Sequence, residues 1–227
     1  MDRNSTLYTF NPVTYAISTL GKLNCSSPSS LYSIALQRTG ILWAMFADGR
    51  LYNYNLKTGV CSSTSFAVNG SSINLFTMTF LKGKTSTTES LYISKQNDDA
   101  NTLGLLSTST FGITTLGNYS ALNTSADLAA FKNGRLFGLF EVSPFVIGEI
   151  NPSNAVVMNQ YSSGITMRGN DSNYAFASYN SNLFIFEGNN TSTNIHVYSV
   201  SSSTLSTVGS ASQMIYGATA STCLGAI

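Results

Sequence analysis

Charged side chains are scarce in this chain. Lys, Arg, Asp and Glu make up 9% of its 227 residues, against roughly 25% in an average soluble domain, and the net charge is +1. Such a chain lacks the basic excess that attracts proteins to nucleic acid or to anionic lipid, so neither is an expected partner. Its polar surface must be built from Ser, Thr and Asn, a composition common in extracellular and cell-surface β-proteins.

Long hydrophobic runs are also missing. The longest extends from Ile41 to Ala47, which is the length of a strand rather than of the ~18–20 residues that a membrane helix needs. We therefore expect no membrane insertion. Residues 1–4 do not resemble a signal peptide, so an exported form would have lost its signal before this chain begins.

Cysteine and histidine are too few for the common metal and catalytic patterns. Cys25, Cys61 and Cys223 have no zinc-site spacing, and both one disulfide with a free thiol and three buried thiols remain open. The one histidine, His196, falls in an alternating segment and is expected to be an exposed or half-buried strand residue. With no Gly-x-Ser-x-Gly elbow present, we expect no enzyme, no cofactor and no metal.

What the chain does have is a repeat of about 44–52 residues. Its mark is a short polar turn between two segments rich in β-branched and aromatic residues, because short polar side chains can hydrogen-bond their own backbone. The turns are Asn11–Thr14, Asn55–Gly59, Ser107–Thr110, Asn151–Asn154 and Ser199–Ser202.

Two further strand-like segments precede each of the last four turns, often separated by turn signals such as Thr39-Gly40 and Asn133-Gly134. The chain thus holds four complete four-stranded units. The N-terminus supplies only the two outer strands of another unit, and the C-terminus supplies an inner-strand pattern, Ile215–Thr219. We predict one all-β domain over residues 1–227, a five-bladed β-propeller whose two chain ends share a blade. A β-sandwich is the alternative, but it would not explain the period.

Loops between the second and third strands of a blade, and between blades, share one face of a propeller, here called the top face. The remaining turns share the bottom face. Sorting the charges in this way places most acids on top and most bases below. The acidic candidates are Asp48, Asp98, Asp99, Glu141, Asp171 and Glu187, and the basic candidates are Arg38, Lys57, Lys82, Lys84, Lys132 and Arg135.

These faces predict a binding module rather than a catalyst. We expect a protein partner or self-association through a loop face, the latter by head-to-tail stacking that salt would weaken. A glycan-binding lectin is the alternative, although most aromatic residues fall at strand positions. A glycoside hydrolase is a further alternative, with Glu141 and Glu187 facing one pocket. A central Ca²⁺ held by the ring of acids is also open, but the Asp-x-Asp spacing of a calcium loop is absent.

Three segments resemble a group of secreted bacterial propeller proteins frequent in myxobacteria. They are Leu7–Thr14 followed by Leu20–Cys25, then Asn133–Phe140, and the ending Gly217–Cys223. The resemblance spans nearly the whole chain and implies a secreted or cell-surface protein, with no activity attached. Trp-Asp repeat endings, kelch double glycines and sialidase Asp-boxes are all missing, and the single Trp43 differs from the Trp-rich five-bladed lectins.

Overall fold

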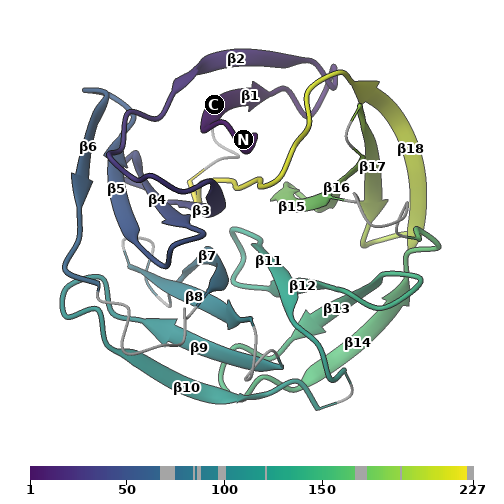
Figure 1. Cartoon of the computed structure of the whole chain (residues 1–227). Helices are drawn as coiled ribbons and strands as arrows, with labels where there is room; N and C mark the ends of the chain where they lie inside the picture. Colours follow the sequence, from purple (N-terminus) through teal and green to yellow (C-terminus); the bar gives the residue numbers. More distant parts are fainter. Residues whose placement is uncertain are drawn as a thin grey trace.

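The chain forms a ring of antiparallel β-sheets around a central axis (Figure 1). The computed structural model describes residues 1–66, 75–83, 85, 88–96, 101–120, 122–166, 173–189 and 191–223. Four sheets have four strands each, paired in chain order from the axis outward, and a fifth has two strands. The protein is therefore an all-β propeller of four-stranded antiparallel blades.

Strands lie on both sides of each predicted polar turn. The two-stranded sheet pairs β1 (Thr6–Phe10) with β2 (Ile17–Lys22). The first blade contains β3 (Leu31–Leu36), β4 (Ile41–Phe46), β5 (Leu51–Asn55) and β6 (Val60–Ser63). The second contains β7 (Phe76–Lys82), β8 (Glu89–Lys95), β9 (Thr102–Leu106) and β10 (Ile113–Asn118). The third contains β11 (Ala126–Ala130), β12 (Leu136–Phe140), β13 (Val146–Ile150) and β14 (Val157–Ser162). The fourth contains β15 (Asn173–Tyr179), β16 (Asn182–Gly188), β17 (Thr193–Ser199) and β18 (Thr204–Ala211).

The repeated polar turns share one geometry. In the first, Asn11 Oδ1 accepts the N–H groups of Val13 and Thr14 at 2.9 and 3.1 Å, and the fifth residue, Tyr15, donates its N–H to Asn11 O at 2.8 Å. That fifth residue is left-handed, with φ 60° at Tyr15. The equivalent positions in the other turns are also left-handed, at Gly59, Phe111, Ala155 and Ser203. The repeat seen in the sequence is therefore a repeated backbone turn.

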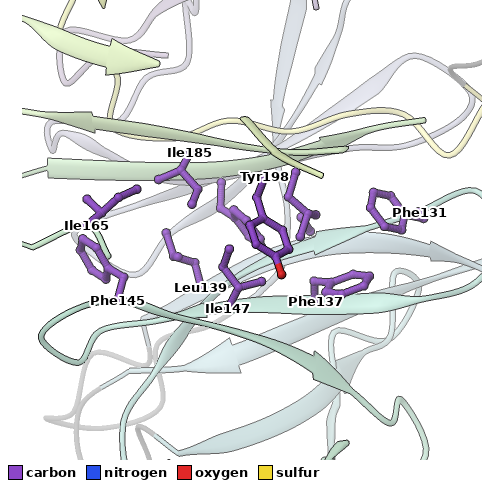
Figure 2. Close-up of a cluster of buried hydrophobic side chains, with 11 residues drawn as sticks. Phe131, Phe137, Leu139, Phe145, Ile147, Ile165, Ile185 and Tyr198 are labelled. Atoms are coloured by element: carbon purple, nitrogen blue, oxygen red, sulfur yellow. The ribbon is translucent and has the colours of Figure 1, made fainter. Parts of the chain in front are cut away.

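The hydrophobic core lies between neighbouring blades. Between the third and fourth blades, Leu139 and Ile147 pack with Ile185 and Tyr198, and all four side chains are buried (Figure 2). Similar buried clusters fill the spaces between the first and second blades and between the second and third. Apolar residues on both faces of a middle strand such as β12 are buried because a blade lies on each side.

The N-terminus meets residues 216–217 of the C-terminal part of the chain. The Met1 ammonium donates to Gly217 O at 2.8 Å, and Tyr216 N–H donates to Met1 O at 2.9 Å. The blade that the two chain ends were expected to share is found in part. Its two outer strands are present as β1 and β2, but Ile215–Thr219 is not assigned as a strand. Within the described residues, Met1 is the main-chain partner of residues 215–220, which we call the terminal segment.

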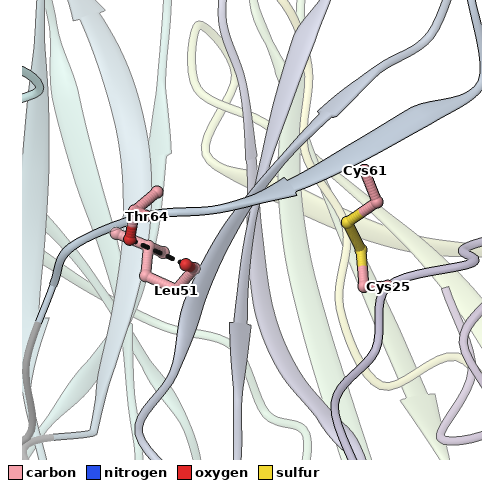
Figure 3. Close-up of a disulfide and its surroundings, with 4 residues drawn as sticks. All are labelled: Cys25, Leu51, Cys61 and Thr64. Carbon is pink, nitrogen blue, oxygen red and sulfur yellow. Dashed lines mark hydrogen bonds between the residues drawn. A yellow bond between two sulfur atoms is a disulfide. The ribbon is translucent and has the colours of Figure 1, made fainter.

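A disulfide fastens this two-stranded sheet to the first blade. Cys25, in the segment after β2, is bonded to Cys61 of β6, and Cys223 is a free, exposed thiol (Figure 3). Close by, Thr64 Oγ1 donates to Leu51 O at 2.7 Å and holds the chain as it leaves the blade. Of the two cysteine arrangements left open by the sequence, the structure has one disulfide and one free thiol.

Candidate functional site

A cavity of about 550 Å³ lies at the top end of the axis. Its walls come from the starts of the innermost strands, from the top-face residues Ala47, Gln96 and Glu141, and from Arg3 near the N-terminus. The volume lies in the range of known ligand pockets, about 300–1,000 Å³. We call it the axial cavity.

Five equivalent positions line the axial cavity. The second residue of each innermost strand lines it, as does the second residue of the terminal inner-strand pattern. We call this set the axial ring: Tyr32, Thr77, Asp127, Tyr174 and Tyr216. Sequence reasoning missed the ring, although aligning the inner strands by their first residues would have found it.

Side chains next to the ring fix the inner strands and the terminal segment to neighbouring blades. Ala126 N–H donates to Ser94 Oγ at 3.1 Å, which joins the third blade to the second. Asn173 Nδ2 donates to Ile215 O, and Ile215 N–H donates to Thr193 Oγ1, which joins the terminal segment to the fourth blade. The axial ring is thus presented by a fixed frame rather than by loops.

The axial cavity combines acids with phenols. Burial raises the pKa of Asp127 to about 7, although N–H groups of Leu128 and Phe176 act in the opposite direction. Burial raises the pKa of Tyr174 as well, followed by the nearby charges of Glu141 and Asp127, and Tyr174 Oη donates to Glu141 Oε2 at 3.4 Å. The Tyr174 phenol therefore stays a neutral hydrogen-bonding group at physiological pH.

The guanidinium group of Arg3 lies over the aromatic ring of Tyr216, a member of the axial ring. The Arg3 guanidinium carbon is 4.3 Å from the centre of the Tyr216 ring. Burial, with the charges of Asp127 and Glu141, also raises the pKa of Tyr32. The cavity can therefore offer ring faces, hydroxyl groups, a carboxylate and a guanidinium to one ligand.

The acidic residues expected on the top face have different surroundings. Glu141 is exposed and lines the axial cavity. Asp48 is half-buried in a top loop, where Ser27 Oγ and Arg50 N–H donate to it at 3.2 and 3.1 Å. Asp98, Asp99 and Asp171 lie outside the described residues.

The structure corrects the expected position of Glu187. It was expected in a loop, but β16 continues to Gly188, and Glu187 is buried inside that strand at 2% exposure. Its Oε2 accepts from Asn194 Nδ2 at 3.3 Å and lies 3.7 Å from His196 Nε2. His196 is itself buried rather than exposed or half-buried, with Nδ1 3.0 Å from Thr207 Oγ1. Glu187 does not line the axial cavity, so Glu141 and Glu187 do not face one pocket.

The basic residues expected on the bottom face fall at its turns and strand ends. Lys57 and Lys132 are exposed, and Lys82 and Arg38 are half-buried. Arg135 is held by Glu149, with Nε–Oε1 and Nη2–Oε2 distances of 2.7 and 2.9 Å, and this bidentate pair lowers the pKa of Glu149. The other candidate, Lys84, lies outside the described residues.

The described residues contain no group of three or more His, Cys, Asp or Glu that could hold a metal ion. The same part of the chain has no helix long and apolar enough to cross a membrane.

Comparison with known proteins shows the fold and no family. No family model matches the chain, and no curated protein does. The resemblance to secreted bacterial propellers therefore stays a prediction. The chain is similar to a structure described as a nidogen/laminin complex, at 9% identity and a TM-score of 0.59, with 96% of this chain and 95% of that one covered.

Two further structures are similar over most of this chain. Hydrazine synthase of Kuenenia stuttgartiensis matches at 9% identity and a TM-score of 0.52, with 92% of this chain and 64% of that one covered. The RRP9 WD40 repeats match at 11% identity and a TM-score of 0.51, with 97% and 65% covered. This chain thus spans less than two thirds of either protein, and identities this low establish the propeller fold alone.

Proposed function

We propose that this protein is a non-enzymatic interaction propeller that binds a polypeptide partner through its top face. The observation that carries the proposal is the axial cavity, where the axial ring, Glu141 and Arg3 converge. Tyrosine and arginine are enriched at protein interfaces because they combine large contact area with hydrogen bonding. A partner side chain entering the cavity would act as the anchor, and the surrounding top loops would form the rim.

One feature supports binding rather than histidine-dependent catalysis. His196 is buried between strands and does not line the cavity, so it is not placed to exchange protons with a ligand there.

The proposal also covers the cellular location of the protein and the number of its blades. We propose a secreted or cell-surface protein, since the Cys25–Cys61 disulfide suits an oxidising compartment. We also propose that the two-stranded sheet and the terminal segment together act as a fifth, incomplete blade. The position of Tyr216 in the axial ring, equivalent to that of Tyr32 and Tyr174, supports this count.

Glycan binding is the second candidate, and the three tyrosines of the axial ring favour it. Sugars stack on aromatic faces and exchange hydrogen bonds with carboxylates and amides, and Asn173 and Gln96 add amides to the lining. A glycan array separates the two ideas. Saturable binding of one sugar class that is lost with Tyr32→Ala would favour the lectin.

Charge reversal on each face tests the main proposal. The top variant carries Arg3→Glu and Glu141→Lys, and the matched bottom variant carries Lys57→Glu and Lys132→Glu; all four side chains are exposed. A partner is captured on the wild-type chain from cell-surface extract, identified and purified, and its Kd is measured for all three proteins. We expect at least tenfold weaker binding by the top variant only. Weakening confined to the bottom variant would refute the proposal.

The partner can also be a second copy of the chain. Sedimentation at high protein concentration, in low and then high salt, distinguishes this case because stacking of acidic on basic faces weakens with salt. A monomer under both conditions rules out self-association.

A further inference from the structure

A second cavity, of about 330 Å³, lies between β1 and the terminal segment. Its lining is largely apolar and includes Leu7–Phe10 from β1 and Gly217–Ala220 from the terminal segment. We call it the strand slot. Pro12 and Leu56, which belong to bottom-face turns, line it, and it shares Ile34, Gly217 and Ala218 with the lining of the axial cavity.

Two opposite walls of the strand slot are main-chain edges, one from β1 and the other from the terminal segment, which is not assigned as a strand. Successive side chains of an extended segment point to opposite sides, so four consecutive residues can line one cavity only where the edge of the segment faces it. This is the case for Leu7–Phe10 and again for Gly217–Ala220. The strand slot is therefore bordered by main chain on both sides.

Both edges lack a neighbouring strand in the described part of the chain. β1 pairs with β2 on its outer side alone. The main-chain groups of Ala218 and Ala220 make no hydrogen bond to any other described residue. Unpaired N–H and C=O groups along an edge are a template for adding a strand.

The four-stranded blades show what normally occupies this position. In each of them a second strand, β4, β8, β12 or β16, lies between the innermost strand and the third strand. At the chain ends, β1 lies where a four-stranded blade has its third strand, and the terminal segment lies where such a blade has its innermost strand. Met1 fills one end of the position between them, and the rest is the strand slot.

The remaining walls are the apolar faces of the neighbouring blades. Leu36 and Leu42 line the slot from the first blade, and Phe184 and Phe186 line it from the fourth. The two large faces of an inserted strand would therefore both be covered by hydrophobic side chains, as they are for β12.

Exposed hydrophobic residues continue from the slot onto the surface. Leu20 and Leu56 line it and are 54% and 36% exposed. Val13, next to the lining residue Pro12, is 75% exposed. Exposed apolar residues grouped beside an apolar opening indicate a contact with another polypeptide.

We propose that the strand slot receives an extended segment of a partner polypeptide, about five residues with alternating apolar side chains, as the missing second strand. The segment runs antiparallel to β1 and hydrogen-bonds its free edge, which is the strand-addition mode of peptide recognition. A small apolar molecule fits less well, since it would cover two rows of main-chain donors and acceptors without pairing them.

Fluorescence anisotropy with a synthetic strand tests the proposal. The probe is a labelled, acetylated hexapeptide of alternating valine and threonine, and the control is the same peptide with N-methyl groups on alternate amides, which cannot donate. We expect saturable binding of the probe and at least tenfold weaker binding of the control. No saturation up to about 1 mM, or equal binding of both peptides, would overturn the proposal.

Two protein variants locate the binding. Ala220→Trp fills the strand slot, and the matched control, Val156→Trp, adds the same ring at an exposed site on the third blade. We expect at least a tenfold loss of probe affinity with Ala220→Trp alone. Equal affinity of the two variants would rule the slot out.

Hydrogen exchange on the wild-type chain needs no variant that might misfold. Bound probe should slow amide exchange within Thr6–Phe10, and slowing confined to other segments would contradict strand addition to β1. The top-face variant should keep full probe affinity, so failure of this inference and failure of the proposed function are distinguishable.

Discussion

The ring of Phe10 in β1 packs edge-on against the ring of Phe184 in β16, with 5.2 Å between ring centres and 71° between the planes. Phe186 meets the same Phe10 ring at 5.1 Å and 84°. Edge-to-face pairs are favoured by the ring quadrupole. These contacts join the N-terminal strand to the last four-stranded blade and so hold the ring closed.

Phe10→Ala should open this contact. We expect a loss of about 3 kcal/mol in the free energy of unfolding, because the change removes a ring packed against two others. Urea unfolding followed by circular dichroism measures the loss. The matched control is Val13→Ala at the exposed tip of the next turn, with a change below about 0.5 kcal/mol. Equal effects of the two substitutions would show that β1 does not hold the ring together.

Removal of the disulfide should weaken the same closure from the other side. The Cys25–Cys61 bond closes a sequence separation of 36 residues, for which the chain-entropy model gives roughly 3–4 kcal/mol. We expect Cys25→Ser/Cys61→Ser to lose about that much in denaturant unfolding. Both proteins carry Cys223→Ser, which removes the exposed thiol. An unfolding midpoint unchanged by the substitutions would argue against a disulfide between these residues.

The carboxyl group of Asp127 should make stability depend on pH. Its pKa is raised by burial from 3.8 to about 7, so the folded protein keeps a proton that the unfolded chain releases. The stability from this proton is fully present below about pH 4 and is lost as the pH rises through 7.

Asp127→Asn removes this dependence. We expect the free energy of unfolding of the variant, relative to that of wild type, to rise by at most about 4 kcal/mol between about pH 4 and 8. One unit of pKa shift corresponds to about 1.4 kcal/mol. Urea unfolding across that range measures it. A parallel pH profile for Asp127→Asn would contradict a raised pKa.

The left-handed turn position should penalise a side chain at Gly59. Gly59 has φ 69°, and Gly59→Ala should cost about 1 kcal/mol because a left-handed L-residue is strained. Gly112 has no positive φ and no close neighbour, so Gly112→Ala should cost nothing and can stabilise by about 0.5 kcal/mol. Thermal unfolding compares the two. A larger loss at Gly112 would show that the turn has another geometry.

The strands were predictable from sequence because local patterns determine them. The two strand-like segments expected before each of the last four turns include β3 and β12. Polar turns at regular spacing mark hairpins, and an Asn side chain forms its turn within a few residues. The propeller fold could therefore be predicted from the local chemistry of the turns and from the regular spacing of the repeat.

The site was less predictable because it depends on contacts between blades. Glu187 was expected in a loop, since nothing local shows that β16 continues past it and that His196 and Asn194 lie beside it. The axial ring brings together residues from five distant segments, and each residue alone reads as an ordinary strand position. The incomplete second-strand position at the chain ends likewise becomes visible only in three dimensions.

Closure of the ring by the two chain ends is the central claim, and one measurement tests it directly. The Met1 methyl group lies against Gly217, which leaves no space for a side chain at that position. With a ¹³C-labelled Met1 methyl group, we predict a strong nuclear Overhauser effect to the Gly217 Hα protons. A Met1 methyl with a random-coil shift and no contact to Gly217 would contradict the claim.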